Sequence, residues 1–157
     1  MAATKCLTNE IINTNLVNLD LDSYTKVDAI KELSKLIDDE GRLTDYDIYV
    51  KSVLDREETF TTGIGMEVAI PHGKSEVVKT ATIAFGKNEN GIEWESMDGK
   101  PVKMVFLLAV PSGNGGDDNQ HLKILAALSR KLMHDEFRDE ILTADKEEVV
   151  RIISELL

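Results

Sequence analysis

The segment VKMVFLLAV, residues 102–110, is apolar at every position except Lys103. An apolar run of this length is typical of a β-strand that is buried on both faces of its sheet. A second run, TATIAF at residues 80–85, also favours a strand, and Asn90-Gly91 predicts a tight turn before the segment IEW. We therefore expect a sheet that contains residues 102–110 and is covered on both faces.

Two helices are predicted ahead of these strands. Apolar residues recur at helical spacing through residues 23–40, and Gly41 follows as a C-terminal stop. Thr44, with Asp47 three residues later, resembles a capping box that opens the second helix. This helix continues through the segment DIYVKSVLDREE and carries Arg56 near its C-terminal end.

Two more helices are predicted after the strands. The segment PSGNGGDDNQ, residues 111–120, is typical of a loop, and a third helix with a stripe of leucines begins near Asn119. Asp145, with Glu148 three residues later, caps a last helix. The summed pattern predicts an α/β protein, with a single domain over residues 1–157 built from a mixed β-sheet flanked by α-helices.

Composition limits the classes of function. The chain has 157 residues, 42% hydrophobic and 30% charged, which fits one domain with a buried core. The net charge of -11 argues against nonspecific nucleic-acid binding, which relies on Lys and Arg, and favours a basic protein partner. The single cysteine, Cys6, can form no internal disulfide. Without a signal-peptide pattern or a long apolar run, we expect a cytoplasmic protein with no direct membrane insertion.

His72 is the first candidate for chemistry. It lies in VAIPHGKS, between Pro71, which fixes its own φ, and Gly73, which frees the backbone that follows. Such neighbours aim a side chain and leave it uncrowded on one side. They also build an ordinary turn, and the spacing alone favours neither interpretation.

The other histidines differ in their surroundings. His121 falls in the first turn of the predicted third helix, where backbone N–H groups favour a neutral imidazole and attract a phosphate. A local hydrogen bond at the helix start is the simpler explanation of the same position. His134, in KLMHDEF, is expected to be a solvated surface residue on a charged helix face.

Taken together, the motifs resemble a known family. The segments LDREETFTTGIGMEVAIPHGKS and VFLLAVP, followed by HLKILAALS, are similar in order and spacing to the fructose/mannitol-type enzyme IIA domains of the bacterial phosphoenolpyruvate-dependent sugar phosphotransferase system (PTS). The resemblance covers nearly the whole chain. It implies a mixed sheet flanked by helices, in agreement with the pattern above.

The resemblance also implies roles for individual residues. His72 accepts a phosphoryl group from the phosphohistidine of the carrier HPr and passes it to a cysteine of a IIB domain, which serves the membrane permease IIC. Arg56 stabilises phosphoryl charge, and His121 lies beside the active histidine and orients the phosphate. No cofactor and no metal are implied. Ser75 and Thr62 are further candidates for a hydrogen bond to the imidazole or to the phosphate.

Elementary chemistry agrees with a histidine relay. Phosphoryl transfer proceeds through a loose, in-line transition state, so the protein mainly positions the partners and stabilises the equatorial oxygens. A free histidine has a pKa of about 6.5, which leaves it largely neutral and nucleophilic at cytoplasmic pH.

Three alternatives belong to other classes. A Ser/His hydrolase would require a nucleophile elbow such as G-x-S-x-G, which the sequence does not contain. A metal site could recruit His72, His121 and Asp117 or Asp118, but no metal-ligand spacing is present. The serious rival is a regulatory module of the same fold, as in the nitrogen-type branch, whose phosphorylation changes a binding surface. We expect a fructose-like transport component.

Overall fold

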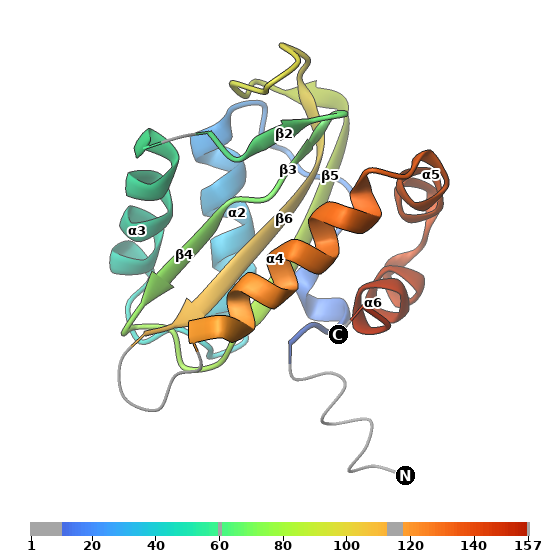
Figure 1. Cartoon of the computed structure of the whole chain (residues 1–157). Coiled ribbons are helices and arrows are strands. Elements are labelled where there is room, and N and C mark those ends of the chain that lie inside the picture. Colours follow the sequence, from blue (N-terminus) through green and yellow to red (C-terminus); the bar gives the residue numbers. More distant parts are fainter. Residues whose placement is uncertain (1–10, 60, 113–117, 157) are drawn as a thin grey trace, which may run out of the picture.

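The computed structural model describes residues 11–59, 61–112 and 118–156, with residues 118–122 described by their backbone alone. Figure 1 shows a twisted sheet with α2 behind it and α4 crossing in front of it. Strands of both orientations pair in this sheet. The α/β class and the mixed sheet flanked by helices are therefore confirmed.

The sheet is organised around its most apolar strand. The strands are β1 (Val17–Asn18), β2 (Gly63–Gly65), β3 (Val68–Ala69), β4 (His72–Ser75), β5 (Thr82–Ile92) and β6 (Val102–Pro111). Strand β6 is buried along its length apart from its half-buried residues Lys103 and Pro111. It pairs with β5 in antiparallel orientation, and with β3 and β4 in parallel orientation. β1 extends the sheet beyond β5, and β2 extends it beyond β3.

The helices cover both faces of the sheet. They are the 3-10 turn η1 (Thr14–Leu16) and the α-helices α2 (Lys26–Asp39), α3 (Tyr46–Thr59), α4 (Asp118–Leu132), α5 (Asp135–Thr143) and α6 (Lys146–Ser154). α2 contacts α3 and β5, α3 contacts β4, and α6 contacts β1. Within the described ranges, no helix is long and apolar enough to cross a bilayer.

Capping side chains explain where the first helices begin and end. Thr25 caps α2, which therefore begins three residues after the predicted start, and Gly41, at φ 73°, follows its end as predicted. The predicted cap of α3 was wrong by one residue. The carboxylate of Asp45, and not the hydroxyl of Thr44, accepts the N–H of Ile48 at 3.1 Å. A carboxylate is the stronger acceptor at the positive end of a helix.

The tight turn predicted at Asn90-Gly91 was also wrong. β5 continues through both residues to Ile92, and its ladder with β6 shifts register between Lys87 and Ile92. Gly91 has φ 92°, so it serves an irregularity inside the strand. Asn90 and Gly91 therefore lie in an irregular stretch of one strand, which resumes its ladder with β6 at Ile92, and not in a hairpin turn.

The C-terminal third contains one helix, α5, that the sequence pattern did not predict as a helix of its own. α5 lies between α4 and the last helix, and His134 precedes α5 as its N-terminal cap residue. His134 is exposed, as predicted, although it lies between two helices and not on a helix face. Asp145 caps α6 as predicted, because its side chain accepts the N–H of Glu148 at 2.9 Å.

Helix α3 approaches β4 closely at Gly73. A Cβ atom built there would lie 2.5 Å from Oγ of Ser52 and 2.7 Å from Cγ2 of Val53. Gly73 lies inside a strand, and its missing side chain leaves room for the helix. The prediction that it frees the backbone of a turn after His72 was therefore wrong. Because neighbouring side chains on a strand point to opposite faces, His72 faces away from α3, toward the side that α4 crosses in Figure 1.

Substituting Gly73→Ala is therefore expected to destabilise the fold by about 1–3 kcal/mol, the usual effect of overpacking. The measurement is the midpoint of urea unfolding followed by circular dichroism. Glu76→Ala, at an exposed position in the turn after β4, is the control and is expected to change stability by less than about 0.5 kcal/mol. An unchanged midpoint for Gly73→Ala would show that α3 does not depend on a bare backbone at this position.

Candidate active site

The backbone that carries His72 is fixed from two directions. His72 is the first residue of β4 and pairs with Leu108 of β6, so it lies in a strand and not in a turn after one. The carbonyl of Pro71 accepts the N–H of Leu108 at 3.0 Å. The carbonyl of Leu108 in turn accepts the hydroxyl of Tyr49 on α3 at 2.9 Å. Burial raises the pKa of Tyr49 well above its usual value, so this hydroxyl remains a protonated donor at neutral pH.

The imidazole of His72 is held in a single tautomer by the backbone. Its Nδ1 lies 3.1 Å from the carbonyl oxygen of Ile70. A carbonyl oxygen can only accept a hydrogen bond, so Nδ1 carries the proton. The lone pair is then on Nε2, which is the nucleophilic nitrogen of this tautomer. His72 is half-buried, which keeps the ring ordered within reach of solvent.

A buried carboxylate supports the segment between β3 and β4 that provides this carbonyl. The N–H of Ile70 donates to the carbonyl of Thr62 at 3.0 Å. The N–H of Thr62 lies 3.3 Å from each carboxylate oxygen of Glu57, and the hydroxyl of Thr62 donates to the same carboxylate. Glu57 and Thr62 are each 5% exposed. A continuous series of hydrogen bonds therefore links Glu57 to His72.

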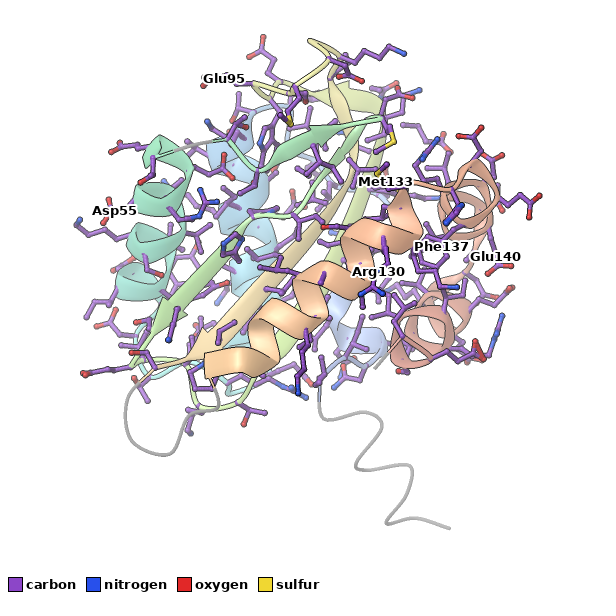
Figure 2. All side chains as sticks on the ribbon, in the orientation of Figure 1. Asp55, Glu95, Arg130, Met133, Phe137 and Glu140 are labelled. Carbon is purple, nitrogen blue, oxygen red and sulfur yellow. The ribbon has the colours of Figure 1, made fainter. Side chains whose placement is uncertain are left out.

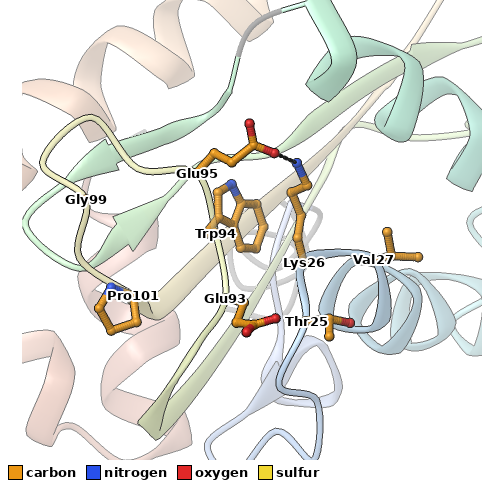
Figure 3. Close-up of a pocket in the computed structure, with 8 residues that line it drawn as sticks. All are labelled: Thr25, Lys26, Val27, Glu93, Trp94, Glu95, Gly99 and Pro101. Carbon is orange, nitrogen blue, oxygen red and sulfur yellow. Dashed lines mark hydrogen bonds and ion pairs between the residues drawn. The ribbon is translucent and has the colours of Figure 1, made fainter.

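Lysine provides the countercharge for this carboxylate. Nζ of Lys26 lies 3.9 Å from Oε2 of Glu57 and 3.3 Å from Oε1 of Glu95. The pair of Lys26 and Glu95 is drawn in Figure 3, where both side chains line a pocket beside Trp94. In contrast to Glu57, Asp55 points outward from α3 in Figure 2. The helix thus directs one of its acidic residues inward, beneath the loop that leads to β2.

The structure places two of the predicted phosphate-binding residues on helices next to the sheet. Arg56 is half-buried in the last turn of α3, the helix that packs on β4. A cation is favoured at this end of a helix because the unpaired carbonyls give it partial negative charge. His121 lies in the first turn of α4, and its side chain is outside the described part of the chain.

The two supporting residues make local hydrogen bonds. Ser75 is the last residue of β4, and its hydroxyl oxygen accepts the N–H of Val77 at 3.3 Å, inside the turn that follows. The hydroxyl of Thr62 donates to Glu57, as described above. Direct contact of either hydroxyl with the imidazole or a phosphate stays a prediction.

Metal binding has little support in the described ranges. No group of three or more His, Cys, Asp or Glu side chains suited to a metal ion occurs among the residues that the structure describes. Asp117, the side chain of Asp118 and Cys6 lie outside those residues, as does the side chain of His121. The alternative that combined Asp117 or Asp118 with the histidines therefore stays a prediction.

The buried contacts of Glu57 were not predicted from the sequence, although a signal was present. Val50, Val53 and Glu57 follow one another at helical spacing on the buried face of α3. A charged residue in a stripe of apolar ones is a candidate for a specific buried partner. The carbonyl of Ile70 left no such signal, because every residue has one.

Comparisons with known proteins identify the family of the chain. The family model described as "Phosphoenolpyruvate-dependent sugar phosphotransferase system, EIIA 2" matches residues 10–156. The "PTS system fructose-specific EIIA component" of Haloferax volcanii is 40% identical over 87% of this chain and 86% of that protein.

Two solved structures share the fold. The nitrogen regulatory protein IIA-Ntr from Neisseria meningitidis superposes with a TM-score of 0.84 at 31% identity, covering 94% of this chain and 99% of that chain. The complex of enzyme IIAMTL and phosphorylated enzyme IIBMTL from Escherichia coli contains a chain with a TM-score of 0.75 at 20% identity, covering 92% of this chain and 97% of that chain. The family model matches nearly the whole length of this chain. The chain therefore belongs to the EIIA 2 family of the phosphoenolpyruvate-dependent sugar phosphotransferase system.

Proposed function

We propose that the protein is a phosphocarrier of a fructose-like sugar phosphotransferase system. It accepts a phosphoryl group from phospho-HPr on His72 and passes it to a cysteine of a IIB domain. The observation that carries the proposal is the hydrogen bond from Nδ1 of His72 to the carbonyl of Ile70, which leaves Nε2 as the nucleophile. A cytoplasmic location agrees with these partners.

The transfer balances without a cofactor. The Nε2 lone pair attacks phosphorus, the P–N bond of the donor phosphohistidine breaks, and its electron pair returns to the donor ring. The imidazole of His72 becomes cationic as the new P–N bond forms, and its Nδ1–H remains donated to Ile70. In the second step a cysteine thiolate attacks phosphorus, and the electron pair of the P–Nε2 bond returns to His72.

The remaining residues have electrostatic roles in this proposal. Arg56 and His121 stabilise the charge on the equatorial oxygens of the phosphoryl group. The net charge of -11 suits a basic donor, because opposite charges accelerate association. A IIB acceptor is supported by the solved complex of enzyme IIAMTL with phosphorylated enzyme IIBMTL.

A second candidate is a regulatory role without onward transport. It is favoured by the likeness to a nitrogen regulatory protein, at a TM-score of 0.84 and 31% identity. In that case phosphorylation of His72 would change the charge of a binding surface. Transfer of the phosphoryl group from His72 to a IIB cysteine separates the two roles.

The first functional prediction concerns the nucleophile. With phosphoenolpyruvate, enzyme I and HPr, the wild type is expected to gain an acid-labile, base-stable phosphoryl group, while His72→Ala gains none because the nucleophile is lost. Incorporation of labelled phosphate over time is the measurement, and His134→Ala, at an exposed surface position, is the matched control. Phosphate retained by His72→Ala would contradict the assignment.

The second functional prediction concerns the nitrogen that is modified. Phosphorus is expected on Nε2, because Nδ1 is engaged with the carbonyl of Ile70. Coupling between ³¹P and ¹⁵N in phosphorylated, ¹⁵N-histidine-labelled protein identifies the bonded nitrogen. A phosphoryl group on Nδ1 would show that the hydrogen bond to Ile70 breaks before transfer.

The third functional prediction concerns Arg56 and His121. Arg56→Ala and His121→Ala are each expected to remain phosphorylatable, with transfer from phospho-HPr slower by about 10- to 1000-fold, the scale of losing one electrostatic stabiliser. Rapid-quench time courses for both variants and for onward transfer to IIB provide the rates. Wild-type rates in both variants would remove these residues from the site.

A further inference from the structure

We propose that Glu57 is a positioning residue for phosphoryl transfer, which fixes the tautomer of His72 through the backbone of Thr62 and Ile70. The inference rests on the proposed function of His72 and names a residue that supports it. Glu57 touches neither the imidazole nor the phosphoryl group in this proposal. It holds the segment between β3 and β4, where the carbonyl of Ile70 selects the Nδ1–H tautomer.

The environment of Glu57 is one that packing alone does not explain. Glu57 continues the buried stripe of Val50 and Val53 and is itself 5% exposed. Removing a carboxylate from water is unfavourable unless hydrogen bonds and a countercharge compensate it. An apolar side chain would fill the same position on α3 without that penalty. The carboxylate at this position is therefore explained by the specific hydrogen-bond donors that it holds.

Those donors belong to Thr62, at the entrance to β2. Both carboxylate oxygens lie 3.3 Å from the N–H of Thr62, and the hydroxyl of Thr62 donates to Oε1. Nζ of Lys26 is 3.9 Å away and supplies countercharge more than a hydrogen bond. Glu57 thus pins one residue by its backbone and its side chain together.

From Thr62 the constraint passes directly to Ile70, across the open end of the hairpin of β2 and β3, and from Ile70 to His72. The carbonyl of Thr62 accepts the N–H of Ile70 at 3.0 Å, and the carbonyl of Ile70 accepts Nδ1–H of His72 at 3.1 Å. The N–H and the carbonyl of one residue belong to different peptide units. The coupling is therefore one of position, because electronic polarisation does not pass directly from one unit to the next.

The hairpin keeps this coupling short. Its turn residues, Met66 and Glu67, both have positive φ, at 57° and 64°, and a two-residue turn of this kind matches the twist of the paired strands. The ladder shifts register between Gly63 and Gly65, so the coupling depends on the direct hydrogen bond from the N–H of Ile70 to the carbonyl of Thr62. Displacing Thr62 therefore displaces the carbonyl of Ile70, and the imidazole of His72 is released to populate its other tautomer, in which Nε2 carries the proton and cannot attack.

The decisive variant is Glu57→Gln, compared with Glu58→Gln at the adjacent exposed position of α3. The amide keeps the size of the side chain but loses the charge and one acceptor oxygen. We expect Glu57→Gln to remain folded by circular dichroism and to show a mixture of His72 tautomers in ¹⁵N NMR of the unphosphorylated protein. Glu58→Gln is expected to keep the wild-type tautomer.

Transfer kinetics provide the second readout. At saturating phospho-HPr the rate for Glu57→Gln is expected to fall in proportion to the loss of the active tautomer, and further because the ring is displaced, to a total of about 10- to 100-fold, the scale of a misplacement near 1 Å. The half-saturating concentration of phospho-HPr is expected to change by less than about threefold, because Glu57 is buried away from a docking partner. Glu57→Asp and Thr62→Val are the second variants, and we expect intermediate effects from both.

The outcomes separate this inference from the proposed function. A single Nδ1–H tautomer in Glu57→Gln, whatever its transfer rate, would overturn the inference, as would a mixed tautomer with the wild-type rate. If Glu57→Gln does not fold, the same two tests on Glu57→Asp and Thr62→Val decide the matter. The tautomer measurement requires no phosphoryl donor, so a wild type that HPr does not phosphorylate would refute the proposed function alone.

Discussion

The contact of α3 with the bare backbone of Gly73 is the constraint on which the site depends. It brings the helix onto β4, so that Tyr49 reaches the carbonyl of Leu108 in the neighbouring strand. Glu57 lies eight residues after Tyr49, about 12 Å further along the helix axis at 1.5 Å per residue. There it reaches Thr62, ahead of the strands that lead to His72. One helix therefore contacts both the strand that pairs with His72 and the residue that precedes the hairpin leading to it.

Local patterns predicted most of the fold because they depend on local physics. The apolar run at 102–110 is β6, and Gly41 and Asp145 act as predicted, since a strand interior and a helix end are recognised by their own residues. Asn90-Gly91 misled because β5 is irregular there and resumes its ladder with β6 at Ile92. The partner of Ile92 is Val102, ten residues further along the chain, and no local preference contains it.

In the site, too, local sequence patterns predicted some features, and others depend on contacts that only the folded chain makes. The neighbours of His72 and the helix-start position of His121 drew attention to these two residues, while the family resemblance added a role for Arg56. Local patterns do not define the mutual geometry of the three. The tautomer of His72 was not predictable, because it depends on the carbonyl of Ile70, a group that every residue has. Glu57 was visible in principle as a carboxylate in an apolar stripe, yet its partner Thr62 is known only from the folded chain.

The carboxylate of Glu57 does not contact the imidazole of His72, and this separation suits a phosphoryl carrier better than direct contact would. In a Ser-His-Asp triad the carboxylate touches Nδ1–H and stabilises the imidazolium that forms during catalysis. A carrier must release its phosphoryl group as readily as it accepts it, so strong stabilisation of the cationic phosphorylated ring would favour acceptance and oppose release. The carbonyl of Ile70 fixes the tautomer with a dipole instead of a full charge. In the proposed role Glu57 contributes rigidity through the backbone, and Lys26, which it shares with Glu95, faces its charge. For the proposed transfer, this arrangement would separate orientation of the nucleophile from stabilisation of its charged form, which would leave the free energy of the phosphoryl group available for the next transfer.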